Sequence, residues 1–150
     1  MALQIRKVPI LPVDLTVPGK LVLAGEYAVL APGEPGLVAA VHPGLVAHWE
    51  AADKTTVSAP DLGVGAISLD DARTALPFVA QVAAVIEEAF GQPVPTGTLI
   101  IQGQMQENGQ KFGLGSSASA CVAAARVWLT AMGRRPSPEE VFRIAGVAHA

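Results

Sequence analysis

A glycine-rich loop followed by a long run of small residues constrains the fold of this 150-residue chain more than any other feature. The loop reads Gly113-Leu114-Gly115-Ser116-Ser117, and mostly small or apolar residues follow it as far as Met132. Glycine lets a backbone turn tightly and approach a ligand, and a helix start offers free N–H groups and a positive dipole end. Because residues 98–102 read as a strand, the order strand, loop and helix is typical of a phosphate-binding site.

The loop by itself leaves two interpretations open. It lacks the lysine of the Gly-x-x-x-x-Gly-Lys-Ser/Thr phosphate loop, and Ala118 stands where the third glycine of Gly-x-Gly-x-x-Gly would be. The structural alternative is a glycine turn with a serine N-cap, since such caps are common at helix starts.

Composition excludes several classes of protein. The chain is 51% hydrophobic and 15% charged, which argues against disorder and for one domain with a core. Ten basic and thirteen acidic side chains form no basic block, which argues against nucleic acid as a partner. The single cysteine, Cys121, lies in an apolar run, which predicts a buried thiol and fits a reducing compartment. No signal-like segment and no apolar run of about 20 residues occurs, so we expect a cytoplasmic protein without a membrane span.

The periodicity and turn residues predict an α+β domain with a mixed or antiparallel sheet. Strands are expected at 15–30, 37–41, 45–50 and 98–102, with further sheet between 53 and 68. The first of these contains a Pro-Gly-Lys turn, and a loop is expected at 31–36. The expected helices are 76–90, closed by Gly91, then 116–132, closed by Gly133, and a last one starting at Ser137.

The last helix has a typical start and no typical end. Ser137 is expected as the N-cap, Pro138 as the first helical residue and Glu140 as the returning partner of a capping box. The apolar pattern is cut at Ala150 without glycine, asparagine or proline, which indicates a piece of a longer sequence. A helix that frays at a natural terminus is the alternative.

A second stretch changes the interpretation of the loop. It runs from Pro18-Gly19-Lys20-Leu21 to Gly25-Glu26-Tyr27-Ala28-Val29-Leu30, and alone its polar residues would be ordinary surface positions. Together, this stretch and the 103–119 segment closely resemble the first and second signature motifs of the GHMP kinases, a superfamily of small-molecule kinases. Within that family, Tyr27 and the pair Lys111-Phe112 are most similar to the bacterial phosphomevalonate kinase branch, whereas mevalonate kinases more often carry histidine at position 27.

The resemblance implies a fold and a set of roles. The fold would be the GHMP-kinase N-terminal domain, which is similar to domain 2 of ribosomal protein S5, and it would occupy residues 1–150. Lys20 and Ser117 would be catalytic, with Lys20 near the transferred phosphoryl group and Ser117 a ligand of Mg²⁺. Glu26 and Tyr27 would join Lys20 at the acceptor. ATP would be bound by Lys111, Gly113, Leu114, Gly115, Ser116, Ser117, Ala118 and Ser119.

The implied reaction is ATP-dependent phosphorylation of 5-phosphomevalonate to 5-diphosphomevalonate, a step of isoprenoid synthesis. Such an acceptor is largely ionised at neutral pH, so cations are needed more than a strong base. Lys20 and Lys111 are two of only four lysines, and both lie in the motifs. The family's third motif and its acidic residue would follow Ala150, so no catalytic aspartate is assigned here.

Three alternatives remain at this point. The chain could derive from mevalonate kinase or another GHMP kinase, it could be a non-catalytic nucleotide-binding fragment, or its glycines could only shape turns. His42, His48 and His149 show no metal-ligand spacing and are expected to be structural or surface residues. Trp49 and Trp128 are expected to pack in the core, and nothing in the residues indicates an oligomeric state.

Overall fold

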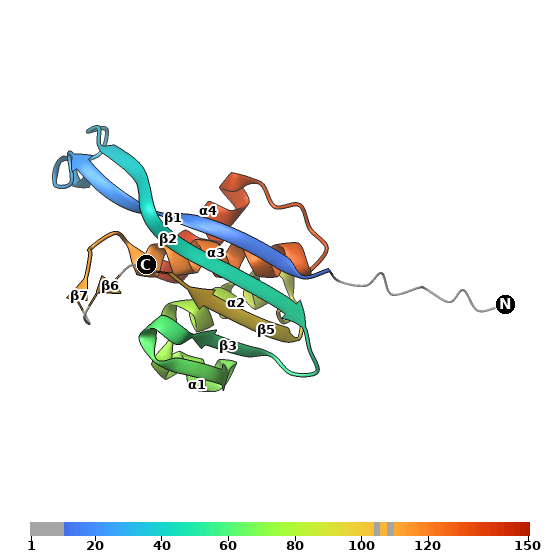
Figure 1. Cartoon of the computed structure of the whole chain (residues 1–150). Helices are drawn as coiled ribbons and strands as arrows, with labels where there is room; N and C mark the ends of the chain where they lie inside the picture. Colours follow the sequence, from blue (N-terminus) through green and yellow to red (C-terminus); the bar gives the residue numbers. More distant parts are fainter. Residues whose placement is uncertain (1–10, 104–105, 108–109) are drawn as a thin grey trace.

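The computed structural model describes residues 11–103, 106–107 and 110–150. The main sheet is mixed and has five strands, as the α+β prediction requires. Figure 1 shows helices packed behind this sheet. The strand order is β1-β2-β5-β3-β4, in which β3 and β5 are parallel and the other neighbours antiparallel. The strands are β1 (Val13–Ala24), β2 (Leu37–Ala51), β3 (Thr56–Ala59), β4 (Val64–Ser68) and β5 (Gly97–Gln102). Short strands β6 (Gln106–Glu107) and β7 (Gln110–Lys111) form a separate pair.

The two breaks predicted in the first hairpin are wrong. Strand β1 runs through residues 18–20 and β2 runs through residues 42–44, although the pairing register shifts between Val17 and Gly19. Pro18 has no N–H for the ladder, and a Cβ on Gly44 would lie 2.3 Å from the Val17 carbonyl oxygen. The irregular residues of both strands therefore face each other in one bulge, and the strands continue beyond it.

The remaining sheet predictions are confirmed with adjusted ends. Strand β1 stops at Ala24 rather than at Leu30, and the short helix η1 (Ala28–Leu30) lies in the turn before β2. The predicted sheet between 53 and 68 consists of β3 and β4, joined by the short helix η2 (Pro60–Leu62). The loop between β1 and β2 and the connection between β3 and β4 both contain the prolines and glycines that indicated them.

Three helices were predicted and four are present in the described residues: α1 (Leu69–Ala75), α2 (Pro77–Phe90), α3 (Ser116–Ala131) and α4 (Pro138–His149). Gly91 closes α2 in the left-handed conformation at φ 67°, as predicted. Helix α1 was missed, although Ser68 caps it by accepting a hydrogen bond from the Asp71 N–H. Ser137 caps α4 as predicted, but the carboxylate of Glu140 accepts from Arg134 at 2.6 Å instead of returning to the cap.

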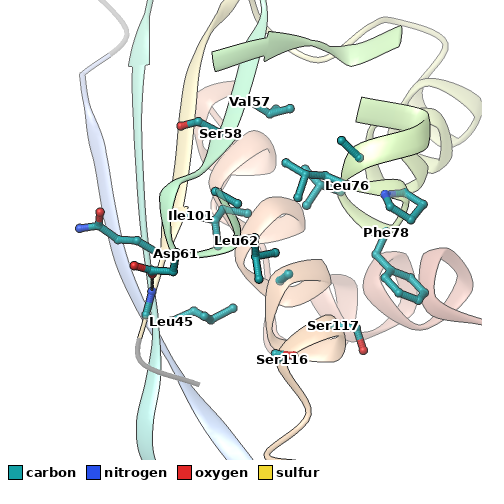
Figure 2. A pocket seen from close by; sticks show the side chains of 17 residues that line it. Leu45, Val57, Ser58, Asp61, Leu62, Leu76, Phe78, Ile101, Ser116 and Ser117 are labelled. Atoms are coloured by element: carbon teal, nitrogen blue, oxygen red, sulfur yellow. Dashed lines mark hydrogen bonds between the residues drawn. The ribbon is translucent and has the colours of Figure 1, made fainter. Parts of the chain in front are cut away.

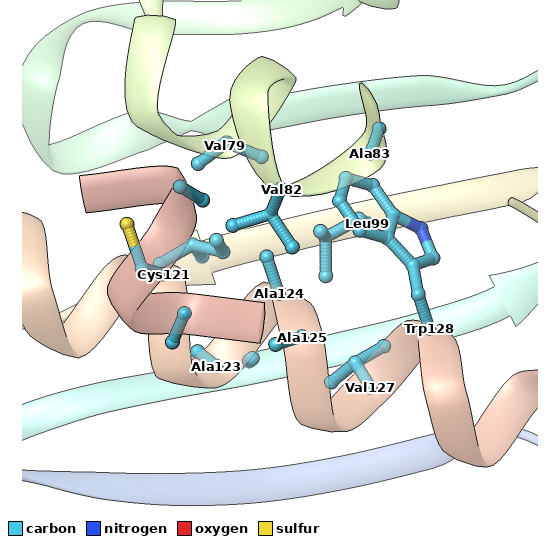
Figure 3. Close-up of a cluster of buried hydrophobic side chains, with 14 of the residues drawn as sticks. Val79, Val82, Ala83, Leu99, Cys121, Ala123, Ala124, Ala125, Val127 and Trp128 are labelled. Carbon is cyan, nitrogen blue, oxygen red and sulfur yellow. The ribbon is translucent and has the colours of Figure 1, made fainter. Parts of the chain in front are cut away.

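Helix α3 lies at the centre of the core, between the sheet and helices α2 and α4 (Figures 1 and 3). Ala123, Ala124 and Ala125 are all fully buried. Their small side chains let the sheet and the neighbouring helices pack close to α3 on several sides. Trp49 and Trp128 are fully buried core residues, as predicted. Within the described ranges, no helix is both long and apolar enough to cross a membrane.

The predicted burial of the single thiol is also confirmed. Cys121 is fully buried on α3, and its Sγ lies 3.9 Å from the carbonyl oxygen of Phe78. Burial raises the pKa of Cys121 to about 11, because the charged thiolate loses its hydration. The thiol is therefore protonated at neutral pH and is not a candidate nucleophile.

Candidate functional site

The two sequence motifs, which are some 95 residues apart in the chain, meet at the start of α3. The Lys20 N–H donates to the carbonyl oxygen of Leu114 at 2.8 Å, which joins β1 to the glycine-rich loop. One turn further, the buried Ser119 hydroxyl donates to the Pro18 carbonyl at 3.1 Å. These two bonds bring the glycine-rich loop and the Pro-Gly-Lys segment to one place.

The Lys20 side chain lies directly against Gly115. A Cβ on Gly115 would be 2.9 Å from both Cγ and Cε of Lys20, so a side chain at residue 115 would displace the lysine. Gly115 also has φ +75°, a conformation that side chains disfavour. Gly113 has a similar φ of +73° but nothing within 4 Å of the added Cβ. Gly115 is therefore needed for space and conformation, and Gly113 for conformation alone.

The N-terminus of α3 is left open by its own side chains. Helices α1 and α4 each begin with a serine cap and acidic residues in the first turn. Helix α3 instead begins at Gly115, with no side-chain cap and no acidic residue in its first turn. Its first N–H groups and positive dipole end therefore remain available to an anion. The side-chain carbons of Lys20 lie beside Gly115 at this helix start.

A largely apolar cavity of about 280 Å³ opens beside the same helix start. Figure 2 shows Ser116 and Ser117 at one end of it, below side chains from η2, β3, β5 and the α1–α2 junction. Asp61 also lines the cavity, and its carboxylate accepts a hydrogen bond from the Gly103 N–H at the end of β5. The apolar wall is formed mainly by Leu45, Val57, Leu62, Leu76, Phe78 and Ile101.

Ser117 has a partner that the sequence did not reveal. Its Oγ lies 2.9 Å from Nε2 of His149, in the last turn of α4. The His149 ring stacks on Phe78, with centroids 5.0 Å apart and planes inclined by 23°. His149 was expected to be structural or on the surface, and it is exposed, with its ring beside Ser117 and Phe78. No spacing rule could have found it, because 32 residues separate it from Ser117.

The other predicted site residues are placed less decisively. Glu26 and Tyr27 lie in the turn between β1 and β2, where Tyr27 is 81% exposed. Neither residue lines the cavity. Lys111 belongs to β7, but its side chain lies outside the described residues. Among the described residues, no group of three acidic, histidine or cysteine side chains could hold a metal ion.

Comparison with known proteins agrees with this geometry. Residues 77–150 match the family model described as the GHMP kinases N terminal domain. The chain is 35% identical to phosphomevalonate kinase of Streptomyces sp. (strain CL190) over 156 aligned positions. This alignment covers 89% of this chain and 42% of that protein. The chain thus spans about two fifths of the length of this curated relative.

Solved structures share the same architecture. Streptococcus pneumoniae phosphomevalonate kinase in complex with phosphomevalonate and AMPPNP superposes with a TM-score of 0.78 at 26% identity, over 91% of this chain and 42% of that one. Methanococcus jannaschii mevalonate kinase superposes with a TM-score of 0.74 at 16% identity, over 91% and 45%, which shows a common fold alone. Residues 77–150 therefore belong to the GHMP kinase N-terminal domain family, and the chain as a whole has the fold of that domain and is homologous to phosphomevalonate kinase.

Proposed function

We propose that residues 1–150 form the ATP-binding half of a cytoplasmic, Mg²⁺-dependent kinase that phosphorylates 5-phosphomevalonate to 5-diphosphomevalonate. The observation that carries this proposal is the contact of Lys20 with Gly115 at the uncapped start of α3. The 35% identity to a phosphomevalonate kinase supports the choice of substrate. A neighbouring structure that holds phosphomevalonate and AMPPNP supports the same choice.

The triphosphate of ATP fits the open helix start. Its oxygens would accept hydrogen bonds from the first N–H groups of α3, which lack side-chain caps. The glycines permit close approach, because a side chain at residue 115 would occupy the space beside Lys20. Residues 113–119 would therefore bind the phosphates mainly through the backbone.

The nucleobase fits the adjoining cavity. A volume of about 280 Å³ with an apolar wall suits a flat aromatic ring, and it opens next to Ser116 and Ser117. Adenine in the cavity and phosphates at the helix start would then lie at the two ends of one continuous site. Away from Ser116 and Ser117, the polar side chains that line it and could recognise the base are Ser58, Asp61 and Gln102.

Mg²⁺ would be contacted by the Ser117 hydroxyl, since the described residues contain no cluster of three acidic, histidine or cysteine side chains that could hold a metal ion. Mg²⁺ in kinases is held mostly by substrate phosphates with one or two protein oxygens, so a single hydroxyl is a sufficient contribution from this half. When bound, Mg²⁺ would neutralise charge on the phosphates. Lys20 would stabilise charge on the transferred group, and Glu26, Tyr27 and Lys111 would contact the acceptor or nucleotide.

Calorimetric titration of the chain with MgATP tests the nucleotide site. We expect binding that Lys20→Met weakens, since methionine keeps the aliphatic stem against Gly115 and removes the charge. Lys54→Met is the matched control, because Lys54 is exposed between β2 and β3. A chain that binds no nucleotide at millimolar concentration would support the interpretation that the glycines only shape turns.

The acceptor is tested with the complete gene product. A coupled assay of ADP release should show turnover with phosphomevalonate and far less with mevalonate. The reverse preference would assign the chain to another GHMP kinase, and nucleotide binding without turnover on any acceptor would indicate a binding module.

A further inference from the structure

One wall of the cavity is joined to the sheet by a side-chain hydrogen bond. This wall is the short helix η2, whose Asp61 and Leu62 both line the cavity. We propose that Asp61 is a positioning residue, which holds η2 against the end of β5 so that Leu62 packs on the nucleobase. The inference rests on the proposed nucleotide site, and it goes beyond that site by naming the residue that shapes its base-binding end.

The Asp61 carboxylate continues a strand ladder that the backbone has already left. Strands β3 and β5 pair in parallel as far as Ser58 and Ile100. Pro60 then begins η2, and proline has no N–H for the ladder. Asp61 and Gly103 have the same separation, 42 residues, as that last pair, and the Asp61 carboxylate accepts the Gly103 N–H (Figure 2). A side chain therefore takes the place of the backbone partner that β3 no longer supplies.

The two partners of this hydrogen bond are held very differently. A Cβ on Gly103 would lie 2.3 Å from the Gly44 carbonyl oxygen, so the end of β5 rests closely on β2. In η2 none of the three residues is buried, and Leu62 is 54% exposed although it lines the cavity. Because core packing contributes little to the position of η2, the charge-assisted bond of Asp61 fixes where Leu62 lies.

The phosphate end of the proposed site does not depend on η2. It is built from the uncapped start of α3 and from Lys20 beside Gly115. A base in the cavity would instead cover the exposed Leu62 side chain, and burial of that apolar surface would contribute to affinity. Loss of the Asp61 bond should therefore weaken the contact with the base and leave the contacts with the phosphates. Inorganic tripolyphosphate, which has the phosphates and no base, is the probe that separates the two ends.

Calorimetric titrations with MgATP and with tripolyphosphate and Mg²⁺ test the positioning role. Asp61→Ala should weaken MgATP binding about fivefold and change tripolyphosphate binding by less than about twofold. Asp61→Asn has the same charge as Asp61→Ala but keeps an oxygen that accepts the Gly103 N–H, so it should recover most of the loss. Asp53→Ala is the matched control, because Asp53 is exposed between β2 and β3 and does not line the cavity. Equal weakening of both ligands by Asp61→Ala, or no weakening, would overturn the proposal.

A double-mutant cycle tests whether Asp61 acts through Leu62. Leu62→Ala alone should also weaken MgATP binding about fivefold, because it removes apolar contact with the base. In the Leu62→Ala chain, Asp61→Ala should then cost less than about twofold more. The same loss with and without Leu62 would overturn the positioning role.

MgITP distinguishes positioning from direct recognition of the base. ITP carries an oxygen in place of the 6-amino group of ATP, so a carboxylate that accepted from this group would favour ATP. A positioning residue acts on either base, and Asp61→Ala should weaken MgATP and MgITP by the same factor. A loss for MgATP that MgITP does not share would show that Asp61 contacts the base, and would overturn the proposal.

The outcomes separate this proposal from the proposed function. A wild-type chain that binds neither MgATP nor tripolyphosphate would overturn the nucleotide site, and the role of Asp61 with it. Equal wild-type affinities for the two ligands would overturn the base-binding end alone. Amide hydrogen exchange at Gly103 tests the hydrogen bond without any ligand: it should be faster in Asp61→Ala than in Asp61→Asn, and equal rates would overturn the proposal. Thermal denaturation of each variant confirms that it folds.

Discussion

Replacement of Gly115 by alanine separates the structural role of the loop from its role in binding. The new Cβ would lie 2.9 Å from Cγ and Cε of Lys20, which is too close for both groups to stay in place. Only side-chain atoms are crowded, so the lysine can swing away at little cost. Gly113→Ala is the matched control, because it imposes the same backbone conformation, φ +73° against +75°, in open space.

The stability loss should be nearly equal in the two variants. Alanine in the left-handed region costs about 1–2 kcal/mol, and its stiffer unfolded chain returns roughly 0.4–1 kcal/mol. Each variant should therefore lose about 1 kcal/mol of unfolding free energy, with a difference of less than about 0.5 kcal/mol between them. Urea denaturation of the two chains measures this quantity.

Nucleotide affinity should differ between the two variants. Displacing Lys20 removes a charge-assisted contact with the terminal phosphate, which is worth about 1.5–3 kcal/mol and corresponds to a roughly 10- to 100-fold weaker Kd. We expect this loss in Gly115→Ala for MgATP, with a smaller loss for MgADP, and little change of the ATP-to-ADP ratio in Gly113→Ala. Equal ratios in the two variants would refute the argument that Gly115 serves to make room for Lys20.

Three further changes test the core and the link between the motifs. Ser119→Ala should lower the free energy of unfolding, measured by urea denaturation, by about 1–2 kcal/mol, since the Pro18 carbonyl loses its hydrogen-bond partner. The control Thr130→Ala should lower it by less than about 0.5 kcal/mol. Equal losses would show that the hydrogen bond between Ser119 and Pro18 contributes nothing. Leu99→Ala should cost about 2–5 kcal/mol, because Leu99 is fully buried and leaves a cavity, and a loss below about 1 kcal/mol would contradict that packing. Burial raises the pKa of Cys121 from 9.0 to about 11, so the unfolded chain releases this proton first and stability should fall between pH 9 and pH 11. Cys121→Ala should remove that part of the decline in melting temperature, and an unchanged pH profile would count against burial as its cause.

Local signals in the sequence were sufficient for most helices and strands. Gly91 after an apolar period predicted the end of α2, and Ser137 before Pro138 predicted the start of α4. Each of these signals acts within a few residues, so no tertiary information was needed. The same kind of signal, Ser68 three residues before Asp71, marks the missed helix α1.

Proline and glycine misled the prediction where tertiary pairing overrode them. Pro18 and Gly44 have the composition of turns, yet each lies inside a long strand, because the partner strand is irregular at the same level. Whether a proline ends a strand or forms a bulge depends on what faces it, and that partner is more than twenty residues away in the sequence.

The sequence by itself determined the chemistry available at the site: two glycines, a run of hydroxyls, a lysine in a second motif and a helix start without acidic residues. It also carried the resemblance that led to the kinase family. Only the tertiary structure placed Lys20 against Gly115, opened the cavity beside Ser116 and brought His149 to Ser117. The physical reason is that residue types and local caps are properties of short segments. These contacts instead join segments that are far apart in the chain: β1 and the glycine-rich loop, η2 and the start of α3, and α4 and α3. The packing of one shared core brings them together.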